Sequence, residues 1–494
     1  MTVTGNAGPV ESGKPVLRIA VVGAGHVGLV SAVAFAALGH RVHVLDIDRP
    51  KVEAMARGDV PFVEPNLDRL LTFGLHAGSL SFHVDPHEAV AGADVVFICV
   101  DTPNGGNGAV DLRAIVGAAR SVGKHVLPGS VVVNRSTAPV GTSEYILSLV
   151  EEEAAGPVSV AVNPEFLAEG SAVRDFFVPD RIVVGATDEA AFDRLIRAYD
   201  PILRRHLPEA VPAHVRRRAA DAGGPVPLVA MDPASAELTK YAANAFLAVK
   251  ISFINEIAAI ADELGADVDR VAEAVGLDRR IGPGFLRAGI GWGGSCFPKD
   301  VLALQGMAET RGLAPRMLRA ANEVNGHQQR WVIRQLQAHL RRLVGRRIGL
   351  LGLSFKPGTD DLRNAPSLDI AAELTELGAR VRAFDPVVHD LPDGFRDCLE
   401  LSANPTALAS DAEALVLVTE WPEFTALDLG EIRGVMRFPL LLDGRNFLDA
   451  ELCREAGFAY VGVGRGASIS PALPVNPSHS TGSSSRPAAL QQVP

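Results

Sequence analysis

The sequence predicts an α/β protein in which two Rossmann-like, doubly wound domains are joined by a long central helix. Short β-branched apolar runs alternate with helical stretches in the first part of the chain, and a second series of such runs begins near Arg347. Between the two series, a helical pattern continues to about Leu264 without an internal glycine or proline. Alternating strands and helices are typical of parallel sheets that helices cover on both faces.

The first domain is predicted to cover residues 17–228, after a flexible tail at residues 1–16. Residues 17–22 form an apolar run, which glycines and then small apolar residues follow, as expected of strand, turn and helix. A second strand at residues 41–46 completes a βαβ unit. Further strands of one parallel sheet are predicted at residues 94–100, 131–135 and 158–162.

The remaining chain is predicted to hold a central helical segment and a second α/β domain. Residues 206–228 are rich in Pro, Ala, Arg and Gly, which indicates an exposed loop or insertion. Asp232 and Pro233 then supply an N-cap and a first-turn proline for a helix about 45 Å long at ~1.5 Å per residue. The predicted segments are a central dimerisation and catalytic one at 229–330, an α/β domain at 331–465 and a disordered tail at 466–494.

Composition and charge exclude several classes of protein. The 494 residues are 47% hydrophobic and carry a formal net charge of −11, which argues against a broad basic surface for nucleic acid. Neither a secretory signal nor an apolar stretch long enough to span a bilayer is recognised, so no membrane partner is expected. The four cysteines lie far apart without a CxxC spacing. A cytoplasmic protein without a metal site is therefore predicted.

A glycine-rich turn, GAGHVG, is the first candidate ligand site. Gly23, Gly25 and Gly28 match GxGxxG directly after a predicted strand, where glycines let the backbone approach a pyrophosphate. Asp46 stands at the end of the next strand, where a carboxylate accepts hydrogen bonds from a ribose diol and repels a 2′-phosphate. The pattern predicts NAD rather than NADP as cofactor, with His26 packed at the helix start.

Two carboxylates four residues apart, Glu165 and Glu169, lie in the segment NPEFLAEG after a predicted strand. If this segment is helical, both carboxylates share one face. One of them could activate water, or both could be solvated acids at a helix start, where the helix dipole favours negative charge. The spacing alone leaves these two interpretations equal.

Lys240 and Asn244 are also four residues apart, on the predicted long helix among alanines and apolar residues. A lysine and an amide on one face can stabilise an oxyanion, and a desolvated lysine can act as a base. A lone lysine on a helix is more commonly solvated. The sequence leaves these alternatives open.

Cys296 follows several glycines in the segment GIGWGGSCFPKD. Glycines let the chain wrap a ligand, and Lys299 can favour the thiolate. Most free cysteines are inert core residues, which fits Cys99 in its apolar run, while Cys398 and Cys453 have no pattern that indicates reactivity. The residues therefore predict an NAD enzyme in which Cys296 is the reactive thiol.

Over roughly residues 17–465 the chain resembles the UDP-glucose/GDP-mannose dehydrogenase family. The motifs that carry the resemblance are GAGHVG, STAPVGT, NPEFLAEG, KYAANAF, FLRAGIGWGGSCFPKD, GLSFKPGTDDLRNAPS, TEWPEF and DGRNFLD, in this order. So many long motifs in one order leave little room for coincidence. FKPGTDDLRNAPS and TEWPEF are most similar to the UDP-glucose branch.

The resemblance implies an NAD-dependent, four-electron oxidation of the C6 alcohol of UDP-glucose to the carboxylate, with two NADH formed per sugar. It implies that Cys296 carries the sugar as a thiohemiacetal and then a thioester. Lys240 and Asn244 are implied to stabilise negative charge on oxygen. For thioester hydrolysis the implied groups are Glu165 as base, and Thr137 and Asp300 as residues that position water.

The resemblance also implies two sets of binding residues. Beyond the glycine-rich turn and Asp46, those near NAD are Lys51, Thr102, Thr137, Glu169, Lys299 and Arg363. Those on the nucleotide sugar are Glu165, Phe166, Leu167, Ala168, Glu169, Lys240, Asn244, Phe285, Leu286, Arg287, Ala288, Gly289, Gly293, Lys356 and Arg445. A homodimer is implied as well, because Arg280 reaches a sugar phosphate that the neighbouring subunit binds.

Two features depart from the family pattern, namely the long basic segment 206–228 with the serine-rich tail, and Trp292, where Tyr or Phe is more usual. GDP-mannose and UDP-N-acetylhexosamine dehydrogenases share the fold and the cysteine, so their substrates are alternatives. A β-hydroxyacid dehydrogenase uses a helix lysine and asparagine without a thiol, and both Cys296 and the second α/β domain argue against it. A non-catalytic NAD-binding protein is the remaining alternative.

Overall fold

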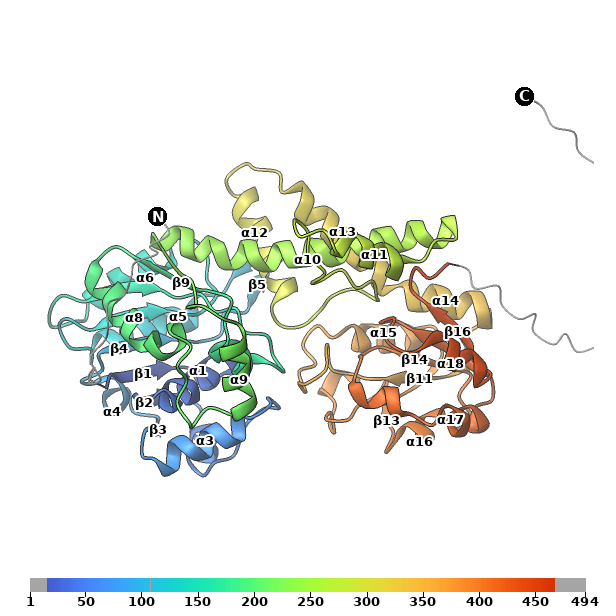
Figure 1. Ribbon diagram of the computed structural model, residues 1–494, viewed down its shortest axis with the longest axis horizontal. Coiled ribbons are helices and arrows are strands. Elements are labelled where there is room, and N and C mark those ends of the chain that lie inside the picture. The colour runs from blue at the N-terminus through green and yellow to red at the C-terminus, as the bar shows by residue number, and fades with distance from the viewer. Residues whose placement is uncertain (1–15, 107, 467–494) are drawn as a thin grey trace, which may run out of the picture.

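The computed structural model describes residues 16–106 and 108–466, so the predictions for almost all of the two tails lie outside the described residues. Two α/β units stand side by side, and a long helix runs across both of them (Figure 1). The predicted fold class, two doubly wound α/β domains with a long central helix, is confirmed.

The sheet of the N-terminal unit has eight strands in the order β10-β9-β8-β7-β4-β1-β2-β3. All neighbouring strands are parallel except β8 and β9. From β3 to β8 the order is that of a doubly wound nucleotide-binding sheet, with its switch point between β1 and β4. The strands are β1 (Arg18–Val22), β2 (Arg41–Leu45), β3 (Leu80–His83), β4 (Val95–Ile98), β7 (Val131–Asn134), β8 (Ser159–Val162), β9 (Ile182–Ala186) and β10 (Leu228–Met231).

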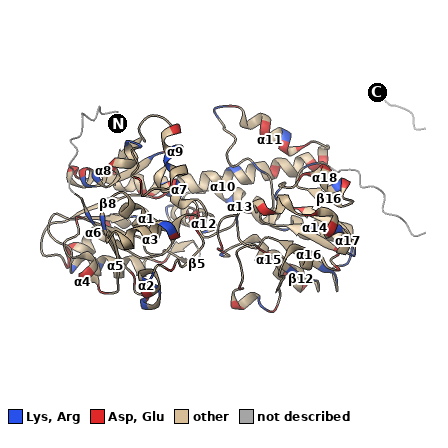
Figure 2. Cartoon of the chain, turned by 60° about the horizontal axis from the view of Figure 1, so that its bottom comes forward, with Lys and Arg blue, Asp and Glu red and all other residues tan. Residues whose placement is uncertain are grey.

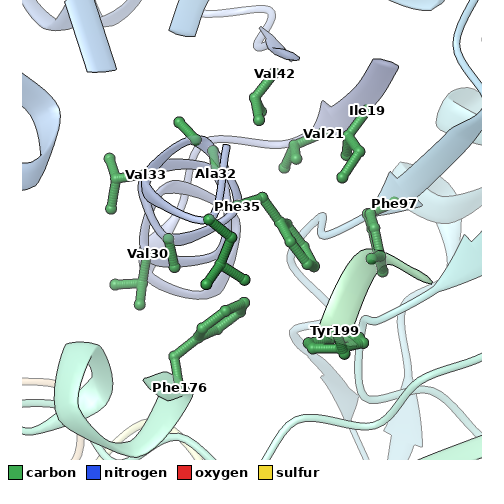
Figure 3. Close-up of a cluster of buried hydrophobic side chains, with 14 of the residues drawn as sticks. Ile19, Val21, Val30, Ala32, Val33, Phe35, Val42, Phe97, Phe176 and Tyr199 are labelled. Atoms are coloured by element: carbon green, nitrogen blue, oxygen red, sulfur yellow. The ribbon is translucent and has the colours of Figure 1, made fainter. Parts of the chain in front are cut away.

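Helix α1 (His26–Ala37) is buried along most of its length because its side chains are small or apolar. The Phe35 ring stacks on Phe97 at 5.0 Å and meets the edge of Phe176 at 5.2 Å (Figure 3). This packing fixes α1, and with it the glycine-rich turn at its start. The other helices of this unit are α2 (Arg49–Ala56), α3 (Leu67–His76), α4 (Pro86–Val90), α5 (Arg113–Gly123), α6 (Thr142–Glu151), α7 (Ala172–Phe177), α8 (Glu189–Leu203) and α9 (Ala213–Asp221), and a hairpin is formed by β5 (Asn104–Gly106) and β6 (Ala109–Val110).

The segment 206–228 differs from the exposed loop that its composition predicts. It contains α9, whose Val215 and Ala219 are buried, and Val215 belongs to the same core as α1. These two residues are four apart and so share one helix face, which the neighbouring arginines obscure in the sequence. Strand β10, which starts at Leu228, then extends the sheet. The prediction of a loop is therefore wrong for the middle of this segment.

Helix α10 (Pro233–Leu264) begins where the sequence predicts, because the Asp232 side chain accepts a hydrogen bond from the Ser235 N–H. It packs against α12 (Phe297–Glu309), α13 (Arg316–Gln329) and β9. Contrary to the expectation from sequence, its length and composition alone would let it cross a membrane. Its buried face includes Lys240, Asn244 and Asn255, so we interpret α10 as a core helix.

The C-terminal unit has a six-stranded parallel sheet in the order β13-β12-β11-β14-β15-β16, which repeats the switch of direction seen in the first sheet. Positions of Lys and Arg, and of Asp and Glu, are scattered along the ribbon of both units (Figure 2). The strands of the C-terminal unit are β11 (Arg347–Leu351), β12 (Arg380–Phe384), β13 (Glu400–Leu401), β14 (Ala414–Leu417), β15 (Leu440–Asp443) and β16 (Ala459–Gly462). The remaining helices are α11 (Val268–Gly276), α14 (Trp331–Leu340), α15 (Pro366–Glu376), α16 (Pro405–Ala409), α17 (Leu429–Val435) and α18 (Ala450–Glu455), with short 3₁₀ turns η1 (Asp393–Phe395) and η2 (Pro422–Ala426).

Candidate active site

The glycine-rich turn follows β1, next to the switch point of the N-terminal sheet. Gly23 has a φ of +97°, and a Cβ there would lie 2.6 Å from the Cys99 carbonyl oxygen. A Cβ on Gly28 would overlap the Gly23 carbonyl oxygen, so both places need glycine. A Cβ on Gly25, just before α1, would have no neighbour closer than 3.8 Å. The backbone at the start of α1 is therefore open to a ligand.

The Asp46 carboxylate points at this turn. Its Oδ2 accepts a hydrogen bond from the Ala24 N–H at 2.8 Å, and Lys51 Nζ lies 3.4 Å away. Backbone N–H groups at a helix start suit a pyrophosphate, and a carboxylate at the end of β2 suits a ribose diol. These residues fit NAD in the way that the sequence predicts.

Glu165 follows β8 in a segment without helical structure, so Glu165 and Glu169 do not share a helix face. The buried Glu165 carboxylate accepts hydrogen bonds from Lys240 Nζ at 2.7 Å and from the Leu167 N–H at 2.6 Å. Burial alone would raise the pKa of Glu165, but Lys240 and the Leu167 N–H together hold it below its ordinary value. Glu165 is therefore a buried carboxylate rather than a solvated acid.

Lys240 is the cation of this buried ion pair. Burial alone would lower its pKa, but the charges of Glu165, Cys296 and Asp300 more than offset this and raise it above its ordinary value. The ammonium therefore stays charged at neutral pH. A charged ammonium can stabilise an oxyanion but cannot act as a base, so the first of the two chemical roles that the sequence leaves open for Lys240 is favoured.

Asp300, in the first turn of α12, is buried between two donors. Asn244 Nδ2 donates to Oδ2 at 2.6 Å, and Lys299 Nζ donates to Oδ1 at 2.8 Å. Lys299 Nζ also lies 3.5 Å from Thr102 Oγ1, which donates to the Thr137 carbonyl oxygen at 2.7 Å. These contacts join α10 and α12 to two loops at the carboxyl edge of the N-terminal sheet.

Cys296 is the residue immediately before α12 and is exposed to solvent. Enough protein nevertheless surrounds the thiol for desolvation to raise its pKa, which the Lys240 charge opposes. The cation that acts on the thiol is thus Lys240 rather than Lys299, because Lys299 is paired with Asp300. The inert role predicted for Cys99 agrees with its burial, which raises the pKa of that thiol to about 12.

A second charged cluster joins the two units. Glu169 Oε1 accepts a hydrogen bond from Ser295 Oγ at 3.0 Å and lies 3.4 Å from Nη2 of Arg363, which is paired with Asp361 at 2.7 Å. Desolvation, assisted by the charge of Asp361, raises the pKa of Glu169. A cavity of about 470 Å³ adjoins the cluster, and its lining includes His26, Phe62, Thr359 and Leu391. The cavity therefore reaches from the start of α1 to the C-terminal unit.

The predicted sugar loop precedes Cys296. Leu286 and Ala288 are buried in the core of the C-terminal unit, so only their backbone can meet a ligand, whereas Phe285 and Arg287 are exposed. The Gly289 N–H donates to Asn255 Oδ1 at 2.8 Å. Asn255 was not recognised in the sequence, although it lies three helical turns after Asn244 on the same face of α10.

Loops of the C-terminal unit pack directly on this segment. A Cβ on Gly293 would overlap the Asn364 carbonyl oxygen. Arg445 donates to the Gly291 carbonyl oxygen at 2.9 Å. Burial lowers the pKa of Lys356, whereas nearby acids, Glu169 and Cys296 among them, oppose this. Lys356 and Arg445, the two cations of the C-terminal unit that are predicted on the nucleotide sugar, therefore lie beside the glycine-rich segment that precedes Cys296.

The other predicted residues lie at the margins of this cluster. Arg181, which sequence reasoning missed, lies 3.6 Å above the Phe166 ring. Leu167 is half-buried and Ala168 is exposed beside them. Arg280 is exposed after α11 and pairs with Asp278 at 2.6 Å. Within the described residues, no contact brings Arg280 to the remaining predicted site residues.

Comparison with known proteins identifies the family. The chain matches the NAD binding domain of the UDP-glucose/GDP-mannose dehydrogenase family at residues 17–203, its central domain at 234–327 and its UDP binding domain at 349–450. It is 43% identical to a UDP-glucose 6-dehydrogenase of Pseudomonas aeruginosa, over 91% of this chain and 98% of that protein. A UDP-glucose 6-dehydrogenase of Rhizobium meliloti is 40% identical, over 91% and 100% of the two chains.

Solved structures agree with these matches. A UDP-glucose dehydrogenase from Pyrobaculum islandicum superposes with a TM-score of 0.81 at 41% identity, over 92% of this chain and 100% of that one. A UDP-D-ManNAc dehydrogenase from Pyrococcus horikoshii gives a TM-score of 0.76 at 28% identity, over 91% and 99%. This protein is an NAD-dependent oxidoreductase with a nucleotide-sugar substrate, and it belongs to the UDP-glucose/GDP-mannose dehydrogenase family.

Proposed function

We propose that this enzyme oxidises the C6 alcohol of UDP-glucose to the carboxylate of UDP-glucuronate, with two NAD reduced per sugar. The observation that carries the proposal is the accessible Cys296 thiol at the start of α12, whose pKa the charge of the buried Lys240 lowers against the effect of desolvation. Substrate choice rests on relatives named UDP-glucose 6-dehydrogenase, which are 40–43% identical, whereas the UDP-D-ManNAc dehydrogenase is 28% identical.

In the first oxidation, C6 of the alcohol loses a hydride, and its hydroxyl proton passes to water beside Asp300. Bound NAD supplies the hydride acceptor. The Lys240 ammonium and the Asn244 amide stabilise the negative charge that develops on O6. Both side chains are buried on one face of α10, where a charge acts more strongly than it does in water.

In the second oxidation, the Cys296 thiol loses its proton, and its sulfur forms a bond to the aldehyde carbon while the oxygen gains a proton. The thiohemiacetal then loses a second hydride, for which NAD is again the acceptor, and its hydroxyl proton passes to water, so that a thioester remains. Water then attacks the thioester carbon. Glu165 takes the water proton, the C–S bond breaks, and the Cys296 sulfur is protonated again. Because Lys240 holds the pKa of Glu165 low, Glu165 is present as the carboxylate that this step needs.

Reaction stoichiometry tests the proposal. We expect two NADH for each UDP-glucose consumed, and little NADH with GDP-mannose or UDP-N-acetylglucosamine at the same concentrations. A steady value of one NADH per sugar would contradict the double oxidation. A preference for either other nucleotide sugar would contradict the substrate assignment alone.

Replacement of the thiol gives a second test. Cys296→Ser should lower the rate of carboxylate formation by roughly a thousandfold or more, because an alkoxide is a far poorer leaving group and nucleophile than a thiolate. NAD affinity, measured by calorimetry, should stay within about twofold of the original, because the cofactor turn is untouched. Cys398→Ser is the matched control, because Cys398 is half-buried in the C-terminal unit outside the site. Unchanged carboxylate formation in Cys296→Ser would exclude the covalent route.

We also propose that the enzyme works as a homodimer in the cytoplasm. Phe246, Phe253 and Ile260 are exposed at seven-residue spacing along α10, so they form one apolar stripe. A stripe of this kind on a helix that crosses both units suits a second copy of the chain. Arg280, exposed beyond the site of its own chain, would then reach the sugar phosphate bound by the partner.

A further inference from the structure

Glu64 is a buried carboxylate without a part in the chemistry proposed above. It lies between α2 and α3, and its side chain is fully shielded from solvent. Glu64 Oε2 accepts a hydrogen bond from the Gly170 N–H at 2.7 Å, and Oε1 accepts one from the Val173 N–H at 3.3 Å. His26 Nε2 lies 3.2 Å from Oε2 without the alignment of a hydrogen bond.

The residues next to Glu64 contact two further parts of the site. The Phe62 ring stacks on the His26 ring at 4.4 Å, directly at the start of α1. The Val63 N–H donates to Asp360 Oδ1 of the C-terminal unit at 3.1 Å. Phe62, Val63 and Glu64 therefore contact three different parts of the site. These are, in the same order, the glycine-rich turn, the C-terminal unit and the NPEFLAEG segment.

The Glu64 contact falls at a tightly packed point of the NPEFLAEG segment. Gly170 has a φ of +79°, and a Cβ there would lie 2.8 Å from the Pro357 carbonyl oxygen. Its neighbour Glu169 makes the contacts to Ser295 and Arg363 described above. A shift of the Gly170 backbone would therefore move Glu169 relative to the loop of Cys296.

We propose that Glu64 is a positioning residue, which holds the Glu169–Gly170 end of the NPEFLAEG segment at a fixed place relative to the start of α1. A buried carboxylate that accepts two backbone N–H bonds resists displacement, because an unpaired buried charge is costly. The inference deepens the proposed function, since it concerns residues that would face NAD and the sugar. Glu64 would hold Glu169 and Gly170 in this way with or without a bound substrate.

Amide hydrogen exchange on the protein without NAD tests that claim directly. In Glu64→Ala, exchange at the Gly170 and Val173 amides should quicken by roughly tenfold or more, because both lose their acceptor. Glu64→Gln keeps the volume and one acceptor oxygen, so it should give an intermediate result and replaces the alanine variant if that fails to fold. Asp68→Asn, an exposed carboxylate on α3, is the matched control. Unchanged exchange at Gly170 and Val173 in both variants of Glu64 would overturn the proposal.

Kinetics separate positioning from a general loss of stability. We expect Glu64→Ala to lower kcat by roughly a hundredfold, because a displacement of about 1 Å in an active site can have an effect of this size. The assay temperature is kept well below the melting temperature of the variant. In a Glu169→Gln background the same substitution should have an effect at least about fivefold smaller, because Glu64 acts through that segment. Fully additive effects would overturn the proposal. If the unaltered enzyme reduces NAD with none of the nucleotide sugars, the proposed function fails, and the exchange experiment still decides the role of Glu64.

Discussion

At the scale of single residues, Lys240 and Glu165 form a buried ion pair in which each side chain keeps the other charged. Burial disfavours the charged form of each, and each partner restores it in the other. Glu165 has a lowered pKa, so it stabilises the fold at pH values above its ordinary pKa of 4.5 and loses this effect as the pH falls below that value. Lys240 has a raised pKa, so it stabilises the fold at pH values below its ordinary pKa of 10.5 and loses this effect as the pH rises above that value. Between these values the pair adds no pH dependence.

Lys240→Met should change this behaviour, because it leaves Glu165 buried without its cation. Desolvation, the largest influence on Glu165, then raises its pKa above 4.5. A group with a raised pKa stabilises the fold at low pH and loses this effect as pH rises through the new pKa. We expect the free energy of unfolding, from urea titration near pH 8, to fall by about 3–5 kcal/mol.

The double variant Glu165→Gln/Lys240→Met is the control for charge. It removes both ions, so its stability should vary with pH like that of the unaltered protein across the range from about 5 to about 8. If the free energy of unfolding of the Lys240→Met variant varies with pH in the same way as that of the unaltered protein, Lys240 and Glu165 are not coupled as ions.

The sequence allowed candidate reactive residues to be chosen, but not their electrostatic partners. Cys296, Lys240 and Asn244 stand out because their residue types suit the chemistry and their local patterns are unusual. The influence of Lys299 on the thiol was assigned from nearness along the chain, yet its ammonium binds Asp300. Which cation reaches the thiol depends on how α10 packs against α12, and no local spacing encodes this.

At the scale of elements, the loop before α12 is held by direct backbone contact with the C-terminal unit. Gly294 donates its N–H to the Asn364 carbonyl oxygen at 3.2 Å, and the neighbouring Gly293 leaves no room for a side chain against the same oxygen. Asn364 itself has a φ of +48°. The loop and its partner therefore fix the approach to Cys296 together.

Gly293→Ala should disturb this contact. The new methyl group would force the loop away from Asn364, at a cost of about 1–3 kcal/mol for overpacking. Because Cys296 is three residues further on, we expect kcat to fall by roughly ten- to a hundredfold with a lower melting temperature. Steady-state kinetics and a thermal melt measure both effects.

Gly284→Ala is the matched control, since a Cβ there meets nothing within 4 Å. It should leave both quantities nearly unchanged. Equal behaviour of the Gly293→Ala and Gly284→Ala variants would show that the contact with Asn364 does not position the thiol.

Helix boundaries could be predicted where end signals were strong. Asp232 before a proline placed the start of α10 correctly. In the segment 206–228 the abundance of Arg, Pro and Gly concealed α9, whose inner face consists of small and β-branched residues. NPEFLAEG was open to a helical interpretation by spacing, but its residues 163–168 adopt no regular structure. Tertiary contacts with Glu64 and the C-terminal unit decide its conformation instead.

At the scale of the whole molecule, the site is assembled from both units along α10. The cofactor turn and Glu165 belong to the N-terminal unit, whereas Lys356, Arg363 and Arg445 belong to the C-terminal unit. Alternating strands and helices were enough to predict both sheets, because that pattern is local. How the units face each other could not be predicted, because it depends on contacts such as Gly170 against Pro357.

The apolar stripe on α10 leads to a prediction about assembly. Phe246→Glu combined with Phe253→Glu places two negative charges on the stripe, where a second copy would have to bury them. Burial of unpaired charge is costly, so we expect light scattering after size exclusion to show a monomer instead of a dimer. Phe73→Glu is the matched control, because Phe73 is a similarly exposed phenylalanine on α3. It should leave the proposed dimer intact.

Loss of the proposed dimer should affect sugar binding more than cofactor binding. The residues that fit NAD lie within one chain, whereas Arg280 is proposed to act on the sugar phosphate of the partner. In the monomeric variant we therefore expect KM for UDP-glucose to rise by roughly tenfold, as for loss of a charged hydrogen bond, with NAD affinity within about twofold. Arg280→Ala should raise the same KM without dissociating the dimer. If the monomer keeps the original KM for UDP-glucose, each chain holds its sugar unaided, and Arg280 belongs to no neighbouring site.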